Sequence, residues 1–263
     1  MTDFKTPTIV FAVAISACVL SQPAAAQDEP TRVRISLGPE LAPPYPGASK
    51  HSFSPFFDLD TAKGDEPFAH EAADESTGLP LVNFGGISVG PMIAITGARD
   101  ADDTAPGLRE IGTTVELGGS VTATITPQLY AFAELGRGIG GHEAWTGQAG
   151  IDYVMRSGDD WLVSFGPRMT YGDGKHARAY FGVTPGESAL TGLEAYDPGG
   201  GIETVGVATS TTVALNERWG MTAYARYDRL IGDARHSPVV AAFGERDQFS
   251  GGLSLNYTFW WKR

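Results

Sequence analysis

Few residues of this sequence have the types and spacing that catalysis or metal binding requires. The five histidines show no metal-ligand spacing, and His142-Glu143 lacks the second histidine of a zinc-binding helix. Gly136, Gly138 and Gly141 match the G-x-G-x-x-G pattern, but a dinucleotide site needs a strand before these glycines and a helix after them. A hairpin loop is expected here instead. We therefore expect no catalytic residue, no metal site and no cofactor.

A histidine and a serine stand side by side at His236-Ser237, a pair that would suit a hydrolase at the lipid-facing rim of a barrel. Adjacent residues of a strand point to opposite faces, so the pair is poorly placed for proton transfer. Asp228 or Asp233 would have to orient the histidine. Packing of a loop is the favoured interpretation, and we expect a protein that is not an enzyme.

Charged residues of both signs fall on the polar face of the alternating segments described below, the face expected to line an interior. One interpretation is a path for ions or small solutes. The other is a network of paired charges that fills a narrow lumen, because an unpaired buried charge is costly. We favour the paired network. The residues are Arg32, Arg34, Asp58, Glu116, Glu134, Asp152, Arg168, Arg226 and Asp228.

Composition excludes several classes of protein. The 263 residues include 31 acidic and 19 basic side chains, for a net charge of -12, so the chain has no overall basic charge with which to hold nucleic acid. A hydrophobic content of 42% is enough for a folded domain. No stretch after residue 26 approaches the roughly 20 apolar residues of a membrane helix. The single cysteine rules out a disulfide scaffold.

The N-terminus resembles a secretory signal peptide. Lys5 precedes a short apolar run, and Ala24-Ala25-Ala26 is a small-residue cleavage site. We expect residues 1–26 to be the signal and residues 27–263 the mature chain. Cleavage before Cys18, as in a lipoprotein, is an alternative.

Apolar and polar residues alternate with a period of two along most of the mature chain. In 218–229 the odd positions run from Trp219 to Tyr227 and are apolar, whereas the even positions are glycine, polar or charged, except Tyr224. The segment 248–259 behaves alike, with Leu253 on its apolar face. Alternation of this kind occurs in soluble sandwiches as well as in membrane barrels.

Three features favour a membrane barrel. Tryptophan and tyrosine lie near strand ends, where they suit a lipid–water boundary. The strands have the length of about 9–11 residues that a tilted membrane strand needs. Tight turns alternate with longer loops at 138–143, 172–199 and 230–247, which should face outward. In hydrocarbon every backbone N–H and C=O must be paired, and a closed sheet pairs them all.

The predicted fold is therefore all-β, a closed antiparallel transmembrane β-barrel of the outer membrane with both termini in the periplasm. We expect twelve strands, or ten without the two weakest segments, 66–72 and 79–84. The strands are predicted at 32–37, 51–60, 66–72, 79–84, 87–97, 111–125, 128–137, 144–155, 160–171, 200–215, 218–229 and 248–260.

Acidic residues crowd the segments 61–78 and 98–105. If these loops face outward beside anionic lipopolysaccharide, they could share divalent cations with it. Loops that merely keep the chain soluble are the favoured interpretation.

Several runs resemble the MipA/OmpV family of outer-membrane proteins, the MltA-interacting proteins. The runs are 136–145, 180–185, 191–196, 227–240, 244–249 and 253–259. The resemblance covers most of the mature chain and is weakest over 61–86. Its loop motifs include Tyr180, Phe181, Gly182, Gly192, Tyr196, Arg229, Gly232, Asp233, Ser237, Pro238, Gln248 and Phe249. Glu194 stands where the family usually has proline. The family tends to end at or near the aromatic of the last strand, whereas here Trp260-Trp261-Lys262-Arg263 follow Phe259.

The resemblance implies a non-enzymatic barrel, surrounded by outer-membrane lipid and lipopolysaccharide, that acts as a scaffold for a periplasmic murein hydrolase and a murein synthase. The expected topology is in tension with that role, because the family-like runs fall in outward loops and the periplasmic turns are short. A channel for small solutes or ions is the alternative function.

Overall fold

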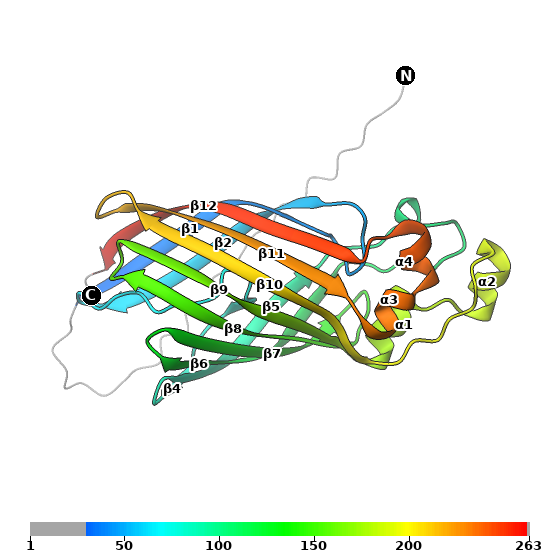
Figure 1. The fold of residues 1–263 in the computed structure, drawn as a ribbon, viewed down its shortest axis with the longest axis horizontal. Helices are drawn as coiled ribbons and strands as arrows, with labels where there is room; N and C mark the ends of the chain where they lie inside the picture. Colours follow the sequence, from blue (N-terminus) through cyan, green and yellow to red (C-terminus); the bar gives the residue numbers. More distant parts are fainter. Residues whose placement is uncertain (1–29, 262–263) are drawn as a thin grey trace, which may run out of the picture.

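The structure, a computed structural model, describes residues 30–261 (Figure 1). The predicted signal peptide and Cys18 lie outside these residues. The strands are β1 Thr31–Ala42, β2 Ser52–Lys63, β3 Thr77–Gly78, β4 Val82–Phe84, β5 Ile87–Thr96, β6 Thr114–Thr126, β7 Leu129–Ile139, β8 Trp145–Ser157, β9 Trp161–Gly172, β10 Gly201–Ala214, β11 Trp219–Leu230 and β12 Asp247–Trp261. The helices are α1 Gly174–Phe181, α2 Pro185–Thr191, α3 Gly232–His236 and α4 Pro238–Phe243, with a 3₁₀ turn at Ala101–Asp103.

The strands form one antiparallel sheet that curls into a nearly closed barrel. Neighbours in sequence are neighbours in space from β5 to β12, and β1 joins β12 with Thr31 opposite Trp261. Both ends of the described chain therefore lie at one end of the barrel, which we call the turn end. The helices gather at the opposite end, which we call the loop end (Figure 1). Among the described strands, β2 and the pair β3 and β4 are the two edges of the sheet.

The period of two sorts side chains between the outside and the inside of the barrel, as the sequence predicts. On β12 the outward Leu253 and Leu255 are exposed, whereas the inward Ser254 and Asn256 are buried. Tryptophans face outward near both ends of the strands, including Trp145 at the loop end and Trp219 at the turn end. Apolar exposed side chains outside and polar buried ones inside are the reverse of a soluble protein and fit a membrane wall. In the part of the chain that the structure describes, no helix is long and apolar enough to cross a bilayer.

The structure has twelve strand elements, but not the twelve that the sequence predicts. The predicted strand 66–72 is wrong, since these residues have no strand pairing and enter the interior of the barrel. The predicted strand 79–84 survives only as β4, with β3 before it. Pro80 separates the two and has no N–H to donate, which breaks the ladder at an edge. The remaining ten strands are long, and each overlaps a predicted one.

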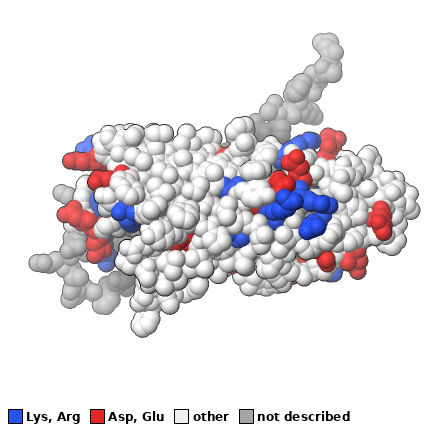
Figure 2. Space-filling model, in the orientation of Figure 1, with Lys and Arg blue, Asp and Glu red and all other residues white. Residues whose placement is uncertain are grey.

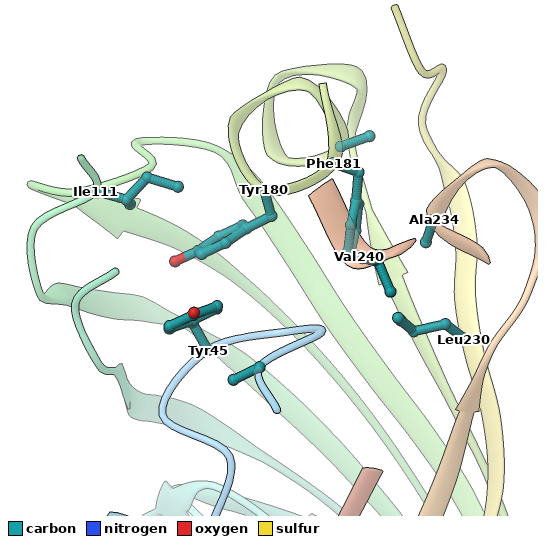
Figure 3. Packing of buried hydrophobic residues seen from close by; sticks show 9 residues of the cluster. Tyr45, Ile111, Tyr180, Phe181, Leu230, Ala234 and Val240 are labelled. Atoms are coloured by element: carbon teal, nitrogen blue, oxygen red, sulfur yellow. The ribbon is translucent and has the colours of Figure 1, made fainter. Parts of the chain in front are cut away.

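The loop end is covered by a cap, which consists of α1, α3, α4 and the loop between β1 and β2. Its centre is an apolar cluster in which Tyr45, Tyr180 and Phe181 meet Leu230 and Val240 (Figure 3). Tyr45 and Tyr180 stack with ring centroids 6.2 Å apart. The long loops 172–199 and 230–247 therefore fold over the barrel end rather than into the lumen. Helix α2 projects beyond the cap (Figure 1).

Candidate functional site

Residues 64–76 pass through the inside of the barrel, and we call them the lumen segment. The segment begins at the turn end, where the Gly64 N–H donates to Pro30 and Arg32 donates to the Gly64 carbonyl. The Phe68 N–H then donates to Asp159 at 3.0 Å. This path corrects the expectation of an acid-rich loop outside the barrel at 61–78. Asp65 and Glu66 stay exposed at the turn end, but Asp74 and Glu75 find their partners in the interior.

Ionic contacts hold the middle of the lumen segment. Asp74 accepts hydrogen bonds from Arg168 Nε at 2.7 Å and from Arg226 Nη1 at 3.0 Å. Arg168 also donates to Asp152 at 2.7 Å, and Arg226 donates to Asp228 at 2.5 Å. Asp152 is fully buried and Arg168 nearly so. Each arginine thus bridges the barrel wall and the lumen segment, which satisfies charges that would otherwise be buried alone.

Hydrogen bonds from uncharged side chains hold the part of the lumen segment nearest the loop end. Ser76 donates through its hydroxyl to Glu134 at 2.8 Å, and Gln148 donates to the same carboxylate at 2.7 Å. Tyr130 donates to Glu75 at 2.8 Å. These contacts, together with the ionic ones, tie the segment to three neighbouring strands, β7, β8 and β9, and to β11, which β10 separates from β9.

A second group of charges lies nearer the turn end. Arg34 pairs with Asp60 at 2.8 Å and stacks on the Phe68 ring at 4.4 Å from its centroid. Carboxylate oxygens of Asp58, Asp60 and Glu71 lie within 4.8 Å of one another. Oxygens of this kind suit Ca²⁺ or Mg²⁺, but Arg34 already balances one of the three charges. The group therefore fits a polar contact between β2 and the lumen segment.

A chamber of about 480 Å³ remains between the lumen segment and the cap. Its floor is Asp74–Ser76, and its upper wall includes Tyr45, His176 and Leu230. His176 contacts Glu203 at 2.9 Å, and the neighbouring His142 contacts Glu116 at 3.4 Å. The lumen is thus filled below the chamber and covered above it.

The structure brings the nine charged residues predicted for the lumen to the inner face of the barrel, in separate groups. Arg32 pairs with Asp159 at the turn end, Arg34 with Asp60, and Arg168 and Arg226 with the central carboxylates. Whether these groups have a functional role stays a prediction. Sequence reasoning missed Asp74, Glu75 and His70, which the structure places among them. The available signal was Pro67, which argues against a strand at 66–72.

Most of the family-like loop residues build the cap or its connections. Tyr180 and Phe181 are in its apolar centre, and the Tyr196 hydroxyl donates to the Asp233 carbonyl at 2.9 Å. Gln248 donates to the Ala48 carbonyl and accepts from the Gly47 N–H. Four of the others shape the backbone of the loops: Gly192 and Gly232 adopt positive φ, Gly182 ends α1 and Pro238 begins α4. The last two make side-chain contacts on neighbouring strands, where Arg229 pairs with Asp247 and Phe249 faces outward against Tyr227.

The candidate hydrolase pair is not arranged for catalysis. The Ser237 hydroxyl is buried, donates to the Phe181 carbonyl at 2.8 Å and accepts from the first amides of α4. His236 is exposed. The serine therefore caps a helix, which is the packing role favoured from the sequence. Gly136, Gly138 and Gly141 lie on β7 and in the hairpin after it, without the strand–helix context of a dinucleotide site.

An ion pair latches α2 to the loop before β6. Arg109 binds Glu187 through two nitrogens, at 2.9 and 2.8 Å. The Thr184 hydroxyl and N–H also donate to Glu187, which completes a capping box at the start of α2. The Arg109 guanidinium lowers the pKa of Glu187 from 4.5 to about 2.

A sheet with an apolar outer face, a polar lumen and its termini at one end defines an outer-membrane β-barrel. Comparison with known families agrees. The model of the family described as MltA-interacting protein MipA matches residues 35–259, so the chain belongs to the MipA family. Among curated proteins, none matches the chain.

Solved structures with a similar course of the chain are barrels of low identity. An outer-membrane channel from Pseudomonas putida is 10% identical with a TM-score of 0.36, over 91% of this chain and 100% of that one. The CymD monoaromatic hydrocarbon channel is 10% identical with a TM-score of 0.35, over 90% of each chain. Neisserial surface protein A is 10% identical with a TM-score of 0.27, over 87% of this chain and 95% of that one. Values this low say nothing of function.

Proposed function

We propose that this chain is a non-enzymatic scaffold of the Gram-negative outer membrane, which docks a periplasmic murein hydrolase and with it a murein synthase. The family name supplies the partner, since it describes a protein that interacts with MltA. The observation that supports a scaffold over a wide pore is the filled lumen. The lumen segment and the central ion pairs occupy the space through which a solute would diffuse.

The proposal assigns docking to the turn end, because both ends of the described chain lie there and single-chain bacterial barrels keep their termini in the periplasm. This end carries exposed charges of both signs, among them Lys63, Asp65, Glu217 and Arg218. Figure 2 shows acidic and basic side chains gathered at the same end as the C-terminus, beyond a largely uncharged barrel wall. Charges of both signs on several short turns can match complementary charges on the surface of a partner protein.

Crosslinking in whole cells, followed by affinity capture of the tagged chain, tests the proposal. A murein hydrolase should be recovered with the parent protein. A charge swap at the turn end, Glu217→Lys with Arg218→Glu, should reduce that recovery severalfold. The matched control is the swap Glu143→Lys with Lys175→Glu at the loop end, where these residues form an exposed pair at 3.0 Å. Recovery of no murein enzyme from the parent would remove the scaffold role, and equal recovery from both swaps would remove the turn-end contact.

A solute or ion channel is the second candidate, and the chamber is the observation in its favour. Conduction would require the lumen segment to leave its contacts with Arg168 and Arg226. Planar-bilayer recordings on the refolded protein distinguish the two functions. A barrel that stays silent at all voltages below rupture supports the scaffold, and discrete conductance steps support the channel.

A further inference from the structure

The walls of the chamber carry a large excess of negative charge. Seven carboxylates line it, against the guanidinium of Arg226 and the imidazole of His176. They come from five different strands and from the lumen segment, so they surround the space rather than cluster on one surface. The carboxylates are Glu40, Asp74, Glu75, Glu116, Glu134, Glu203 and Asp228.

Arginines balance only two of these carboxylates. Asp74 and Asp228 pair with Arg226, and Asp74 also pairs with Arg168. Glu40 accepts from the Tyr224 hydroxyl at 2.5 Å, and the partners of Glu75 and Glu134 are likewise neutral donors. A hydroxyl or amide donor satisfies a carboxylate oxygen without cancelling its charge. Glu116 and Glu203 contact His142 and His176, which cancel a carboxylate charge only when they are protonated. The chamber therefore keeps a net negative potential.

The barrel strengthens that potential, because low-dielectric walls focus the field of the charges that line them. Anions are excluded from such a space, and cations are concentrated in it. A bound cation would also lower the repulsion among the carboxylates themselves.

Aromatic and apolar side chains form the rest of the wall. Phe56 and Tyr224 lie with ring centroids 5.8 Å apart, and Tyr45 and Met92 line the same space. A cation held near the face of an aromatic ring gains further attraction. Carboxylates beside aromatic rings fit a ligand that joins a positive group to an apolar body, rather than a bare metal ion.

We propose that the chamber binds small organic cations, such as amines or quaternary ammonium compounds with one aromatic or aliphatic group. This inference goes beyond the scaffold role and does not depend on it. Access lies at the sheet edges, because Pro55 and Phe57 of β2 and Thr77 of β3 all line the chamber. Among the described strands, no backbone pairing joins β2 to β3 or β4.

Calorimetric titration of the refolded full-length protein in a non-ionic detergent tests the proposal with three probes. Benzyltrimethylammonium combines the charge and the ring, tetramethylammonium has the charge alone, and phenylacetate has the ring with the opposite charge. We expect benzyltrimethylammonium to bind most tightly, tetramethylammonium more weakly, and phenylacetate not at all. Phenylacetate binding as tightly as benzyltrimethylammonium would overturn the proposal, and so would no binding of either cation.

Variants locate the binding. Glu40→Gln with Glu203→Gln keeps side-chain shape, and the removal of two carboxylates that line the chamber from β1 and β10 should weaken benzyltrimethylammonium at least about tenfold. Glu143→Gln removes an exposed carboxylate at the loop end and should leave the affinity unchanged. Unchanged affinity in the double variant, with the barrel shown to be folded by circular dichroism, would overturn the proposal.

A second variant keeps the test decisive if the double variant does not refold. Ala94 lines the chamber from β5. Ala94→Phe should fill part of the chamber and weaken benzyltrimethylammonium without removing any charge. Full affinity in this variant would place the cation elsewhere and refute the assignment.

Discussion

The ion pairs of Asp74 should hold the lumen segment in place, and the substitution Asp74→Asn tests this. The change keeps the size of the side chain but removes the charge that faces Arg168 and Arg226, at 2.7 and 3.0 Å. Removal of one partner from a buried ion pair costs about 3–5 kcal/mol. Because every 1.4 kcal/mol is about tenfold in an equilibrium, release of the segment from the wall should become roughly a hundredfold to a few thousandfold more frequent.

Hydrogen–deuterium exchange read by mass spectrometry, on protein in lipid nanodiscs, measures that release. Peptides from residues 64–76 should exchange faster in Asp74→Asn by a factor of this order, whereas peptides from β9 and β10 should exchange as in the parent. Asp102→Asn is the control, since Asp102 is exposed in the loop after β5. Exchange of the lumen segment at the parental rate in Asp74→Asn would refute the idea that these charges anchor it.

Three further predictions concern the sheet edges and the cap. Backbone amides of β2 should exchange faster on average than those of β9, because β2 has a hydrogen-bonded neighbour on one side only and β9 has two; equal protection would show that the barrel closes in lipid. The latch between Arg109 and Glu187 should be fully present above pH 4.5 and lost as the pH falls toward the pKa of about 2, because a lowered folded-state pKa stabilises only while the carboxylate is ionised. Protease cleavage near α2 should therefore increase as the pH falls over that range. The variant Glu187→Gln should show the same increase at neutral pH. Ser237→Ala should lower the free energy of unfolding by about 1–2 kcal/mol through loss of the helix cap and a buried hydrogen bond, as measured by urea titration; no loss would contradict the capping role.

The long strands could be predicted from the sequence because lipid and lumen act on alternate residues. Each outward position must be apolar because it faces lipid, and each inward position can be polar. Leu253 and Ser254 therefore differ because of the face on which each lies, not because of distant contacts. The same logic places Arg168 and Asp152 on the inner face without any knowledge of their partners. The positions of the ten long strands follow from this period, although the predicted strand 32–37 covers only half of β1.

The lumen segment could not be predicted in this way because its contacts are distant in sequence. Asp74 meets Arg168 and Arg226, which are 94 and 152 residues away. A polar chain inside a barrel has no periodic requirement, and its acidic residues look like those of a solvent-exposed loop. The edge position of β2 was missed for the same reason, since the closed barrel was inferred from strands that include 66–72.

The cap could be predicted in part: better than the lumen segment, but less well than the long strands. The family resemblance points to Tyr180, Tyr196 and Gln248, but it does not say what they do. Their contacts with Tyr45, Asp233 and Ala48 come from loops far apart in the chain. A resemblance can therefore identify residues that matter to the fold before their partners are known.

Cysteine accessibility at Ala72 tests most directly the claim that residues 64–76 fill the lumen. Ala72 is 5% exposed and packs against Tyr130, Phe132 and Val154. In the folded barrel, Ala72→Cys should resist both a water-soluble maleimide and a lipid-soluble one, and should react once urea unfolds the protein. Leu79→Cys on the exposed edge should react without unfolding. Rapid labelling of Ala72→Cys in the folded state, from water or from lipid, would contradict a segment enclosed by the barrel.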